Sequence, residues 1–126
     1  KVLRISLLHD VSEVRITDIP LVAARYLGCK EEAEECAVSD MMDALGDEYK
    51  DLWMDFKKRS SIEAMIVRAA DKLDLYLEAV MWEMAGAKKP TEHFWNEGEN
   101  QKDFDFHPVV KALFEEIKKR HNGVVA

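Results

Sequence analysis

The 126-residue sequence is poor in cysteine, with two residues, and in proline and glycine, with three and five. Cys29 and Cys36 are seven positions apart, which matches no zinc-finger spacing, and two thiols do not make a disulfide framework. We therefore expect both to be reduced, structural thiols of a cytoplasmic protein. No apolar run approaches the roughly 20 residues that cross a bilayer, and no secretory signal is visible.

The sequence also lacks a surplus of positive charge, since its formal net charge is −7. A chain this acidic is not expected to have the backbone of a nucleic acid as its main partner. A small phosphate substrate remains compatible, because one bound metal ion reverses the local field. Hydrophobic residues make up 48% and charged residues 34%, which is the balance of a folded, globular protein. The length fits one domain, residues 1–126, with a sizeable core.

Helical spacing of apolar residues runs through most of the chain, and alternating strand patterns and internal repeats are missing. The pattern therefore predicts an all-α domain. A polar stretch between residues 87 and 106 is expected to be a loop. The expected helices cover residues 1–12, a short segment capped by Thr17 or Asp18, and residues 30–45, 47–59, 60–85 and 108–121.

The helix expected at 60–85 is the longest. Ser60 and Glu63 have the spacing of a capping box ahead of an apolar run. Apolar residues then cover most of the helix circumference, which predicts a long, central, buried helix. The aromatic stripe of the preceding helix, from Tyr49 to Phe56, is also expected in the core. Three apolar residues near the end of the long helix are suited to a dimer interface, although the core is the stronger expectation: Met81, Trp82 and Met84.

Two places combine polar side chains with apolar surroundings. His9 and Asp10 end the first expected helix, and Glu13 shares a face with both if that helix continues. Asp71 lies between Val67 and Leu75 on an apolar part of the long helix, where an ionised carboxylate is costly unless it is paired or bound to metal. A pairing of Asp71 with Arg68 or Lys72 and a metal site remain open at this point.

The segments "LLHDVSEVRITDIP" and "IVRAADKLDLYLEA" resemble the HD superfamily of metal-dependent phosphohydrolases, and within it the branch of the 5′-deoxynucleotidases. The resemblance covers residues 1 to about 84 and rests on His-Asp-x-x-Glu, then x4-Asp-x-Pro, then an aspartate on a long apolar helix. It implies a single HD-type helical bundle. It further implies that His9, Asp10 and Asp71 hold a divalent metal ion, such as Co²⁺, Mn²⁺, Zn²⁺ or Mg²⁺.

The resemblance also implies an activity, the hydrolysis of deoxynucleoside 5′-monophosphates to nucleoside and phosphate. Glu13 is then expected to move the proton of the attacking water or to position that water. Asp18 is expected to contact the sugar or to support the site, with helix capping as its ordinary alternative. Family members act on other nucleotides too, so dNTPs, cyclic nucleotides and alarmones stay open as substrates. A non-catalytic helical interaction module is the alternative of another class, and a homodimer is expected in either case.

The family's first metal-binding histidine and a substrate-contacting arginine precede the His-Asp pair, and this chain has neither. It starts at Lys1, without methionine, in sequence typical of a helix. We therefore expect a longer natural protein and an incomplete site in this chain alone. The remaining histidines replace no family motif and are expected in surface or capping roles: His93, His107 and His121.

Overall fold

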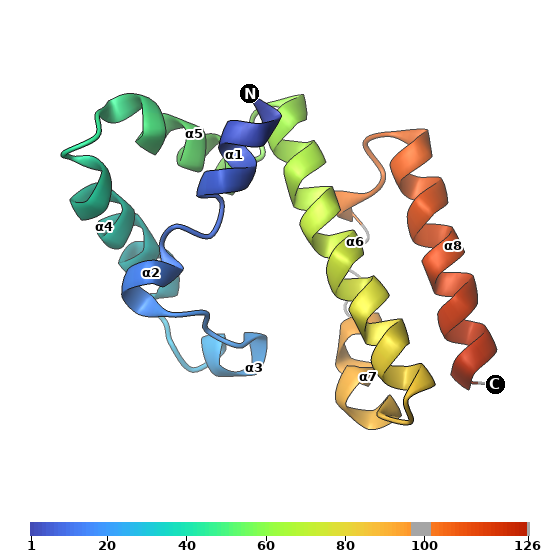
Figure 1. Cartoon of the computed structure of the whole chain (residues 1–126). Coiled ribbons are helices and arrows are strands. Elements are labelled where there is room, and N and C mark those ends of the chain that lie inside the picture. The colour runs from blue at the N-terminus through green and yellow to red at the C-terminus, as the bar shows by residue number, and fades with distance from the viewer. Residues whose placement is uncertain (97–101, 126) are drawn as a thin grey trace. The chain divides into compact units, whose positions relative to one another are not determined.

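The computed structural model describes residues 1–96 and 102–125. In these ranges the regular structure is helical and there is no strand, which confirms the all-α prediction (Figure 1). None of the described helices is long and apolar enough to span a membrane. The chain divides into two compact units, Lys1–Ala64 and Met65–Ala126, and each is described by itself. The prediction of one domain over residues 1–126 stays a prediction.

The first unit is built from short helices joined by tight turns. Its core forms where α5 packs on α1 and α4. Trp53 is 1% exposed at the centre of this core, next to Val38 and Met42 of α4. The predicted core stripe of α5 is therefore buried at Leu52, Trp53 and Phe56, while Tyr49 is half-buried at its edge. The helices of this unit are α1 (Val2–Leu8), α2 (Glu13–Ile16), α3 (Leu21–Ala24), α4 (Lys30–Met42) and α5 (Asp47–Lys58).

Several helix boundaries in this unit differ from the predicted ones. The first helix ends at Leu8, because the chain then tightens into turns in which Val11 N–H donates to Leu8 C=O at 3.0 Å. Neither Thr17 nor Asp18 caps the next helix, since Pro20 is the N-cap of α3. The helix predicted to reach residue 45 ends at Met42.

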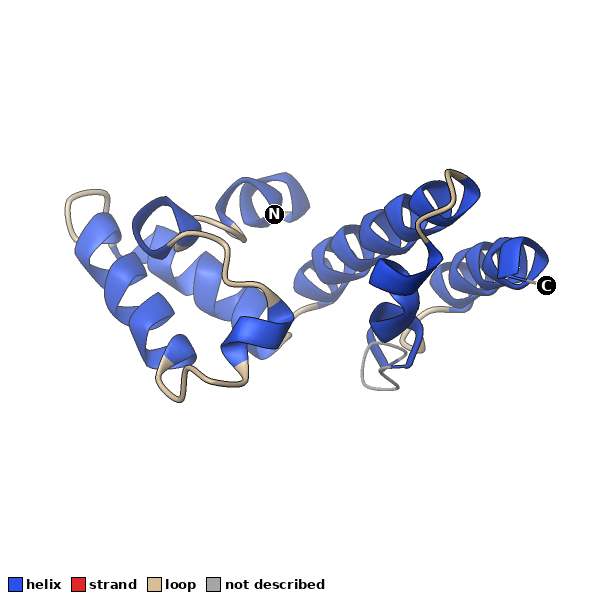
Figure 2. Cartoon of the chain, turned by 90° about the horizontal axis from the view of Figure 1, so that it is seen from below, coloured by secondary structure: helices blue, strands red, loops and turns tan. Residues whose placement is uncertain are grey.

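The second unit has two long helices side by side, with a shorter helix packed on one side of the pair (Figures 1 and 2). Helix α6 (Ile62–Met84) begins within the first unit and runs through the second, α7 (Lys88–Asn96) follows it, and α8 (Pro108–Val125) ends the chain. Helices α6 and α8 run in the same direction (Figure 1). Ser61, not the predicted Ser60, caps α6, because its Oγ accepts a hydrogen bond from Ala64 N–H at 3.2 Å.

The core of the second unit gathers aromatic rings around one stripe of α6. The ring of Tyr76 lies 5.1 Å from that of Phe114 on α8, and Phe104 stacks on Phe114 at 4.2 Å. Arg68 Nε donates to the nearly buried carboxylate of Asp103 at 3.2 Å, which fixes the segment before α8 to α6. Aromatic packing therefore decides which side of α6 faces inward.

Three predictions for this unit are wrong. Helix α7 lies inside the stretch predicted as a loop, whose residues 97–101 are outside the described ranges. Helix α8 continues past Asn122 and Gly123, which were expected to end it. Helix α6 is not buried all round, because only one stripe of it meets α7 and α8. Large apolar side chains remain exposed on its other stripes, among them Met81, Trp82 and Met84.

A buried carboxylate ties the three helices of this unit together. Glu83 is 2% exposed, and its Oε1 accepts hydrogen bonds from Thr91 Oγ1 and Trp95 Nε1, both at 2.7 Å. Its Oε2 lies 2.8 Å from His121 Nδ1 on α8, and the His121 ring stacks on that of Trp95 at 3.9 Å. Burial acts to raise the pKa of Glu83, but its bonds with His121, Thr91 and Trp95 outweigh burial and hold that pKa below its usual value.

We expect Glu83→Gln to lower the free energy of unfolding by about 2–3 kcal/mol, because the amide leaves a buried donor unmatched. The folded-state pKa of Glu83 is depressed, so its contribution is present above the unfolded-state pKa of about 4.5 and disappears as the pH falls through the folded-state value. Urea unfolding at neutral pH and at several values below about pH 4.5 tests this. Equal acid sensitivity of the variant and the wild type would refute the role of Glu83.

Candidate metal centre

His9 and Asp10 lie in the turn that follows α1, where the backbone leaves the helix. The turn sets the two side chains next to each other, with His9 Nε2 2.9 Å from Asp10 Oδ2. His9 is partly buried and its ring meets the edge of Phe56 on α5, with the centroids 5.4 Å apart. The first two predicted ligands are therefore brought together by local structure alone.

The orientation of His9 suits a metal ligand. Its Nδ1 lies 2.7 Å from the carbonyl oxygen of Ser6, one turn earlier in α1. A hydrogen bond from Nδ1–H to that carbonyl leaves the lone pair on Nε2, the nitrogen beside Asp10. Two atoms that each bind one ion at about 2.1 Å lie about 3–3.5 Å apart. Nε2 and Oδ2 are 2.9 Å apart, slightly closer than this, as in a direct ion pair, so the two side chains would have to separate slightly to bind an ion. The chemistry of the imidazole–carboxylate pair fits a divalent metal ion.

Glu13 opens α2, three residues after Asp10. It is exposed overall, yet partial burial and the negative charges of Asp10 and Asp18 raise the pKa of its carboxyl above the usual value. Lys30 and His9 act in the opposite direction. Glu13 is therefore close enough to Asp10 and Asp18 for their charges to act on it, although the helix predicted to connect it with His9 is interrupted.

Asp18 follows a residue with an unusual backbone. Thr17 has φ 62° and ψ 164°, a region that β-branched residues rarely adopt. Its N–H donates to the carbonyl of Glu13 at 2.8 Å and closes α2. The chain therefore turns sharply between Glu13 and Asp18, and the conformation of Thr17 costs on the order of 1–3 kcal/mol.

Thr17→Gly should raise the free energy of unfolding by about 1 kcal/mol, because the relief of strain exceeds the extra entropy of the unfolded glycine chain. Thr17→Ala is the matched control, since it shortens the side chain but keeps the Cβ that causes the strain. The urea midpoints of the three proteins test this. If Thr17→Ala raises the free energy of unfolding as much as Thr17→Gly, the threonine side chain beyond Cβ causes the destabilisation, not backbone strain.

Asp71 lies on α6, in the second unit. The prediction that its side chain is buried is wrong. Its side chain is exposed, because it projects from the opposite side of α6 to the core residue Ala69. The predicted pairing with Arg68 is not seen, since Arg68 bonds to Asp103. In the part of the chain that the structure describes, the Asp71 carboxylate has no ion-pair partner. The predicted ligands are thus divided between the two units.

Within residues 1–96 and 102–125, no three histidine, cysteine or acidic side chains lie together as a metal-binding group. The other histidines have structural contacts. His107 Nδ1 accepts a hydrogen bond from Val109 N–H at 3.3 Å, which is the expected capping role. His93 lies on α7 beside Phe94, and His121 pairs with Glu83. That buried pair was missed, because no local pattern connects residues 38 positions apart.

Comparison with known proteins decides the family, since a family model described as "HD domain" matches residues 1–113. The chain belongs to the HD-domain family. It is 25% identical to the protein named 5′-deoxynucleotidase HDDC2 of Xenopus laevis, over 98% of this chain and 63% of the relative. A solved structure of a conserved hypothetical protein from Pyrococcus furiosus has a TM-score of 0.73 and 36% identity, over 96% of this chain and 65% of that one.

This HD-domain chain therefore spans slightly less than two thirds of the length of both relatives. The residues that carry the resemblance, from His9 to Asp71, lie within the part that the family model matches. Cys29 and Cys36 are free thiols, and both are exposed.

Proposed function

We propose that this HD-domain chain carries the catalytic residues of a divalent-metal-dependent phosphohydrolase, a 5′-deoxynucleotidase that converts deoxynucleoside 5′-monophosphates into nucleoside and phosphate. The observation that carries the proposal is the His9–Asp10 pair, with Nε2 and Oδ2 2.9 Å apart and Nδ1 facing the carbonyl of Ser6. Salt bridges between His and Asp are common, but the family match over this turn favours a metal-binding role.

His9, Asp10 and Asp71 would hold the ion, which Co²⁺, Mn²⁺, Zn²⁺ or Mg²⁺ could provide. A bound divalent ion lowers the pKa of its water ligand and polarises a phosphate oxygen. Imidazole and carboxylate ligands are compatible with several of these metals, so the donor set does not select one.

Glu13 would accept the proton of the attacking water. A carboxylate with a raised pKa binds a proton more readily than an ordinary one, and burial, Asp10 and Asp18 all raise the pKa of Glu13. Asp18 would contact the sugar or support the site from the turn made by Thr17. Its position just beyond α2, electrostatically coupled to Glu13, supports a role beside the reacting groups.

The substrate class is supported by the relative named 5′-deoxynucleotidase, although the identity is only 25%. A phosphate-release screen tests it, with deoxynucleoside and ribonucleoside monophosphates, dNTPs, cyclic nucleotides and alarmones, each with the four metals. Phosphate release from deoxynucleoside monophosphates that stops on chelation and returns with metal is expected. Preference for another nucleotide would overturn the substrate class, and no hydrolysis at all would favour an interaction module.

A further inference from the structure

Two lysines share one carboxylate in the first unit. The side chain of Glu34, on α4, is only 12% exposed. Its Oε2 accepts a hydrogen bond from Lys57 Nζ on α5, and its Oε1 lies 3.6 Å from Lys30 Nζ. Both lysine side chains are partly buried as well. These three residues, which we call the lysine cluster, therefore carry one positive charge in excess.

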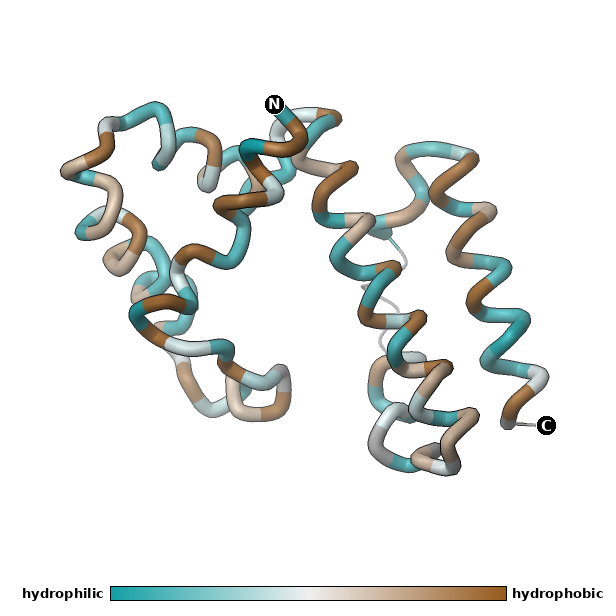
Figure 3. Tube along the Cα trace, in the orientation of Figure 1, coloured by the Kyte–Doolittle hydropathy of each residue, from teal (hydrophilic) through white to brown (hydrophobic). Residues whose placement is uncertain are grey.

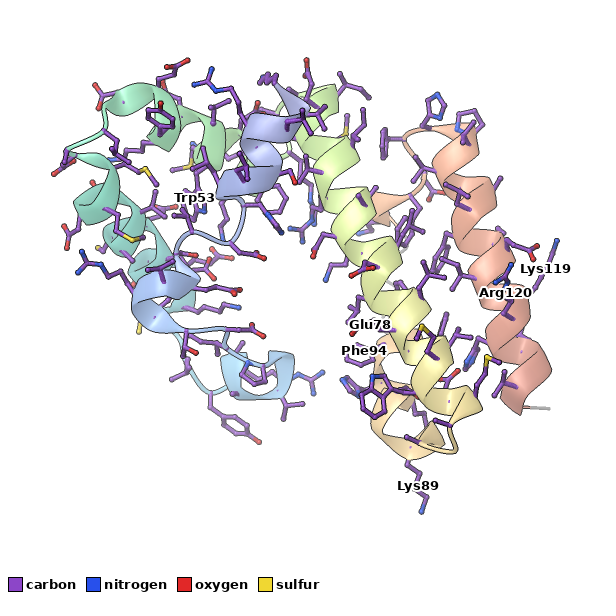
Figure 4. All side chains as sticks on the ribbon, viewed as in Figure 1. Trp53, Glu78, Lys89, Phe94, Lys119 and Arg120 are labelled. Atoms are coloured by element: carbon purple, nitrogen blue, oxygen red, sulfur yellow. The ribbon has the colours of Figure 1, made fainter. Side chains whose placement is uncertain are left out.

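The two lysines of the cluster are held unequally. Lys57 is fixed by its hydrogen bond to Glu34 and by its place over the ring of Trp53, 5.6 Å from the centroid. Trp53 itself is buried in the core of the first unit (Figure 4). Lys30 has only the longer pair, whose 3.6 Å exceeds the length of a hydrogen bond.

The ammonium group of Lys30 has donors to spare. Among the residues that the structure describes, Lys30 Nζ makes no hydrogen bond and no ion pair besides the long one to Glu34. A lysine ammonium has three N–H donors and no acceptor, so it can donate to an anion. Lys30 is therefore the cation of the cluster that is available to a ligand.

Lys30 lies beside the candidate metal centre. It is the first residue of α4, whose first turns are hydrophilic (Figure 3), and Glu13 is the first residue of α2. Because α2 and α4 pack against each other, the two side chains are close, and the charge of Lys30 acts to lower the pKa of Glu13. Asp10 and Asp18 act on the same carboxyl in the opposite direction. The loosely held cation and the predicted site residues are thus neighbours within one unit.

A phosphate monoester needs positive charge at this site. When ionised, Asp10, Glu13 and Asp18 bring three negative charges, and a phosphate monoester dianion brings two more. A single divalent ion does not offset these charges. His9 has to be neutral when it binds metal, so it adds no positive charge in that state. A lysine binds phosphate as a point charge, and Lys30 carries such a charge next to Glu13.

We propose that Lys30 is a phosphate-binding residue of this site, and that Glu34 and Lys57 are positioning residues that hold its ammonium group there. The inference rests on the proposed function for the identity of the anion, the phosphate group of a nucleotide. Because Lys57 occupies one oxygen of Glu34, the attraction of Glu34 for Lys30 is divided, and Lys30 can turn to phosphate. The ordinary alternative for Lys30 is a helical ion pair with Glu34, four residues later, and nothing else.

Lys30→Gln should raise KM for a deoxynucleoside monophosphate and Kd for inorganic phosphate, each by about 10–100-fold, because a charge-assisted hydrogen bond is lost. Lys30→Arg should keep most of the affinity, since it keeps the charge. Lys58→Gln is the matched control, because Lys58 is an exposed lysine on α5 of the same unit and its loss removes the same charge. Initial rates and isothermal titration with inorganic phosphate, both with metal present, measure the two constants.

The phosphate titration does not depend on turnover, so it separates this inference from the proposed function. A wild type that hydrolyses no monophosphate but binds phosphate, and loses that binding in Lys30→Gln, would support Lys30 and refute the proposed function. A wild type that hydrolyses monophosphates, with KM and Kd unchanged in Lys30→Gln, would overturn the role of Lys30 and leave the proposed function standing. Equal losses in Lys58→Gln and Lys30→Gln would also overturn it.

The positioning roles predict effects of opposite sign. Glu34→Gln should lower Kd for inorganic phosphate about 3-fold, because it removes the carboxylate that competes for Lys30. Lys57→Gln should raise Kd by a similar factor, because Glu34 then pairs with Lys30 alone. The double variant should return to the affinity of Glu34→Gln. Weaker phosphate binding by Glu34→Gln with unchanged helical circular dichroism would overturn the positioning role.

Discussion

Under the proposed function, Glu13→Gln should lower kcat on a deoxynucleoside monophosphate by about 10²–10⁴-fold, the usual effect of removing a positioned acid or base. The amide keeps the size of the side chain and loses the group that accepts the proton. Because Glu13 is exposed, the free energy of unfolding should change by less than about 0.5 kcal/mol. Initial rates, elemental analysis and urea unfolding of the same preparation measure the three quantities.

The pattern of the kinetic loss defines the role of Glu13. An equal fall in kcat and kcat/KM, with metal retained, means that its interaction is made only in the transition state. Glu31→Gln is the matched control, since Glu31 is an exposed glutamate in the first turn of α4, on the same unit. Near-normal kcat of Glu13→Gln with metal bound would remove Glu13 from the mechanism.

The ordinary alternative for Glu13 is a surface ion pair with Arg15 or Arg68. Arg68 bonds to the carboxylate of Asp103. The cation that acts on the pKa of Glu13 is instead Lys30, together with His9. A role limited to surface pairing predicts a stability loss below about 1 kcal/mol and unchanged turnover. Kinetics therefore separates the two roles even where stability does not.

Sequence pattern predicted the helices that bury a regular stripe. The apolar stripe of α5 predicted where this helix begins and ends and which of its faces is buried, from Leu52 to Phe56. Gly86 ends α6 as expected, with φ 98°, a conformation that glycine adopts without strain. The family resemblance likewise rested on residue patterns within two short segments, and the family match supports it.

The failures have a common physical cause, because they depend on contacts between distant segments. The α7 sequence has few apolar residues, and α7 is fixed by bonds from Thr91 and Trp95 to Glu83, which no periodicity reveals. The burial of α6 was overestimated because an apolar side chain is buried only where another element covers it. Met81 and Met84 are as apolar as core residues, yet their side chains remain exposed.

Asp71 shows the same limit within the candidate site. Its apolar neighbours along the helix suggested burial, but position around the helix decides exposure, and Asp71 projects away from Ala69 and the core. Its assignment as a metal ligand rests on the resemblance. Its exposed carboxylate, without an ion-pair partner in the described ranges, has neither a structural bond to lose nor a burial cost to offset.

This setting makes Asp71→Asn a clean test of ligation. Loss of an exposed carboxylate should change the free energy of unfolding by less than about 0.5 kcal/mol, so a loss of metal would not reflect unfolding. Residues that only orient a ligand account for about 10–100-fold in metal affinity. Removal of a ligand should therefore weaken metal binding by more than about 100-fold and abolish phosphate release.

Asp74→Asn is the matched control, because Asp74 is exposed on the next turn of the same helix and carries the same charge. Elemental analysis and isothermal titration with Mn²⁺ or Co²⁺ should give full occupancy for Asp74→Asn and little metal for Asp71→Asn. His9→Gln and Asp10→Asn should match Asp71→Asn, since the three residues are proposed to hold one ion. Full metal occupancy in Asp71→Asn, together with its loss in His9→Gln, would leave the His-Asp pair as a ligand set without Asp71.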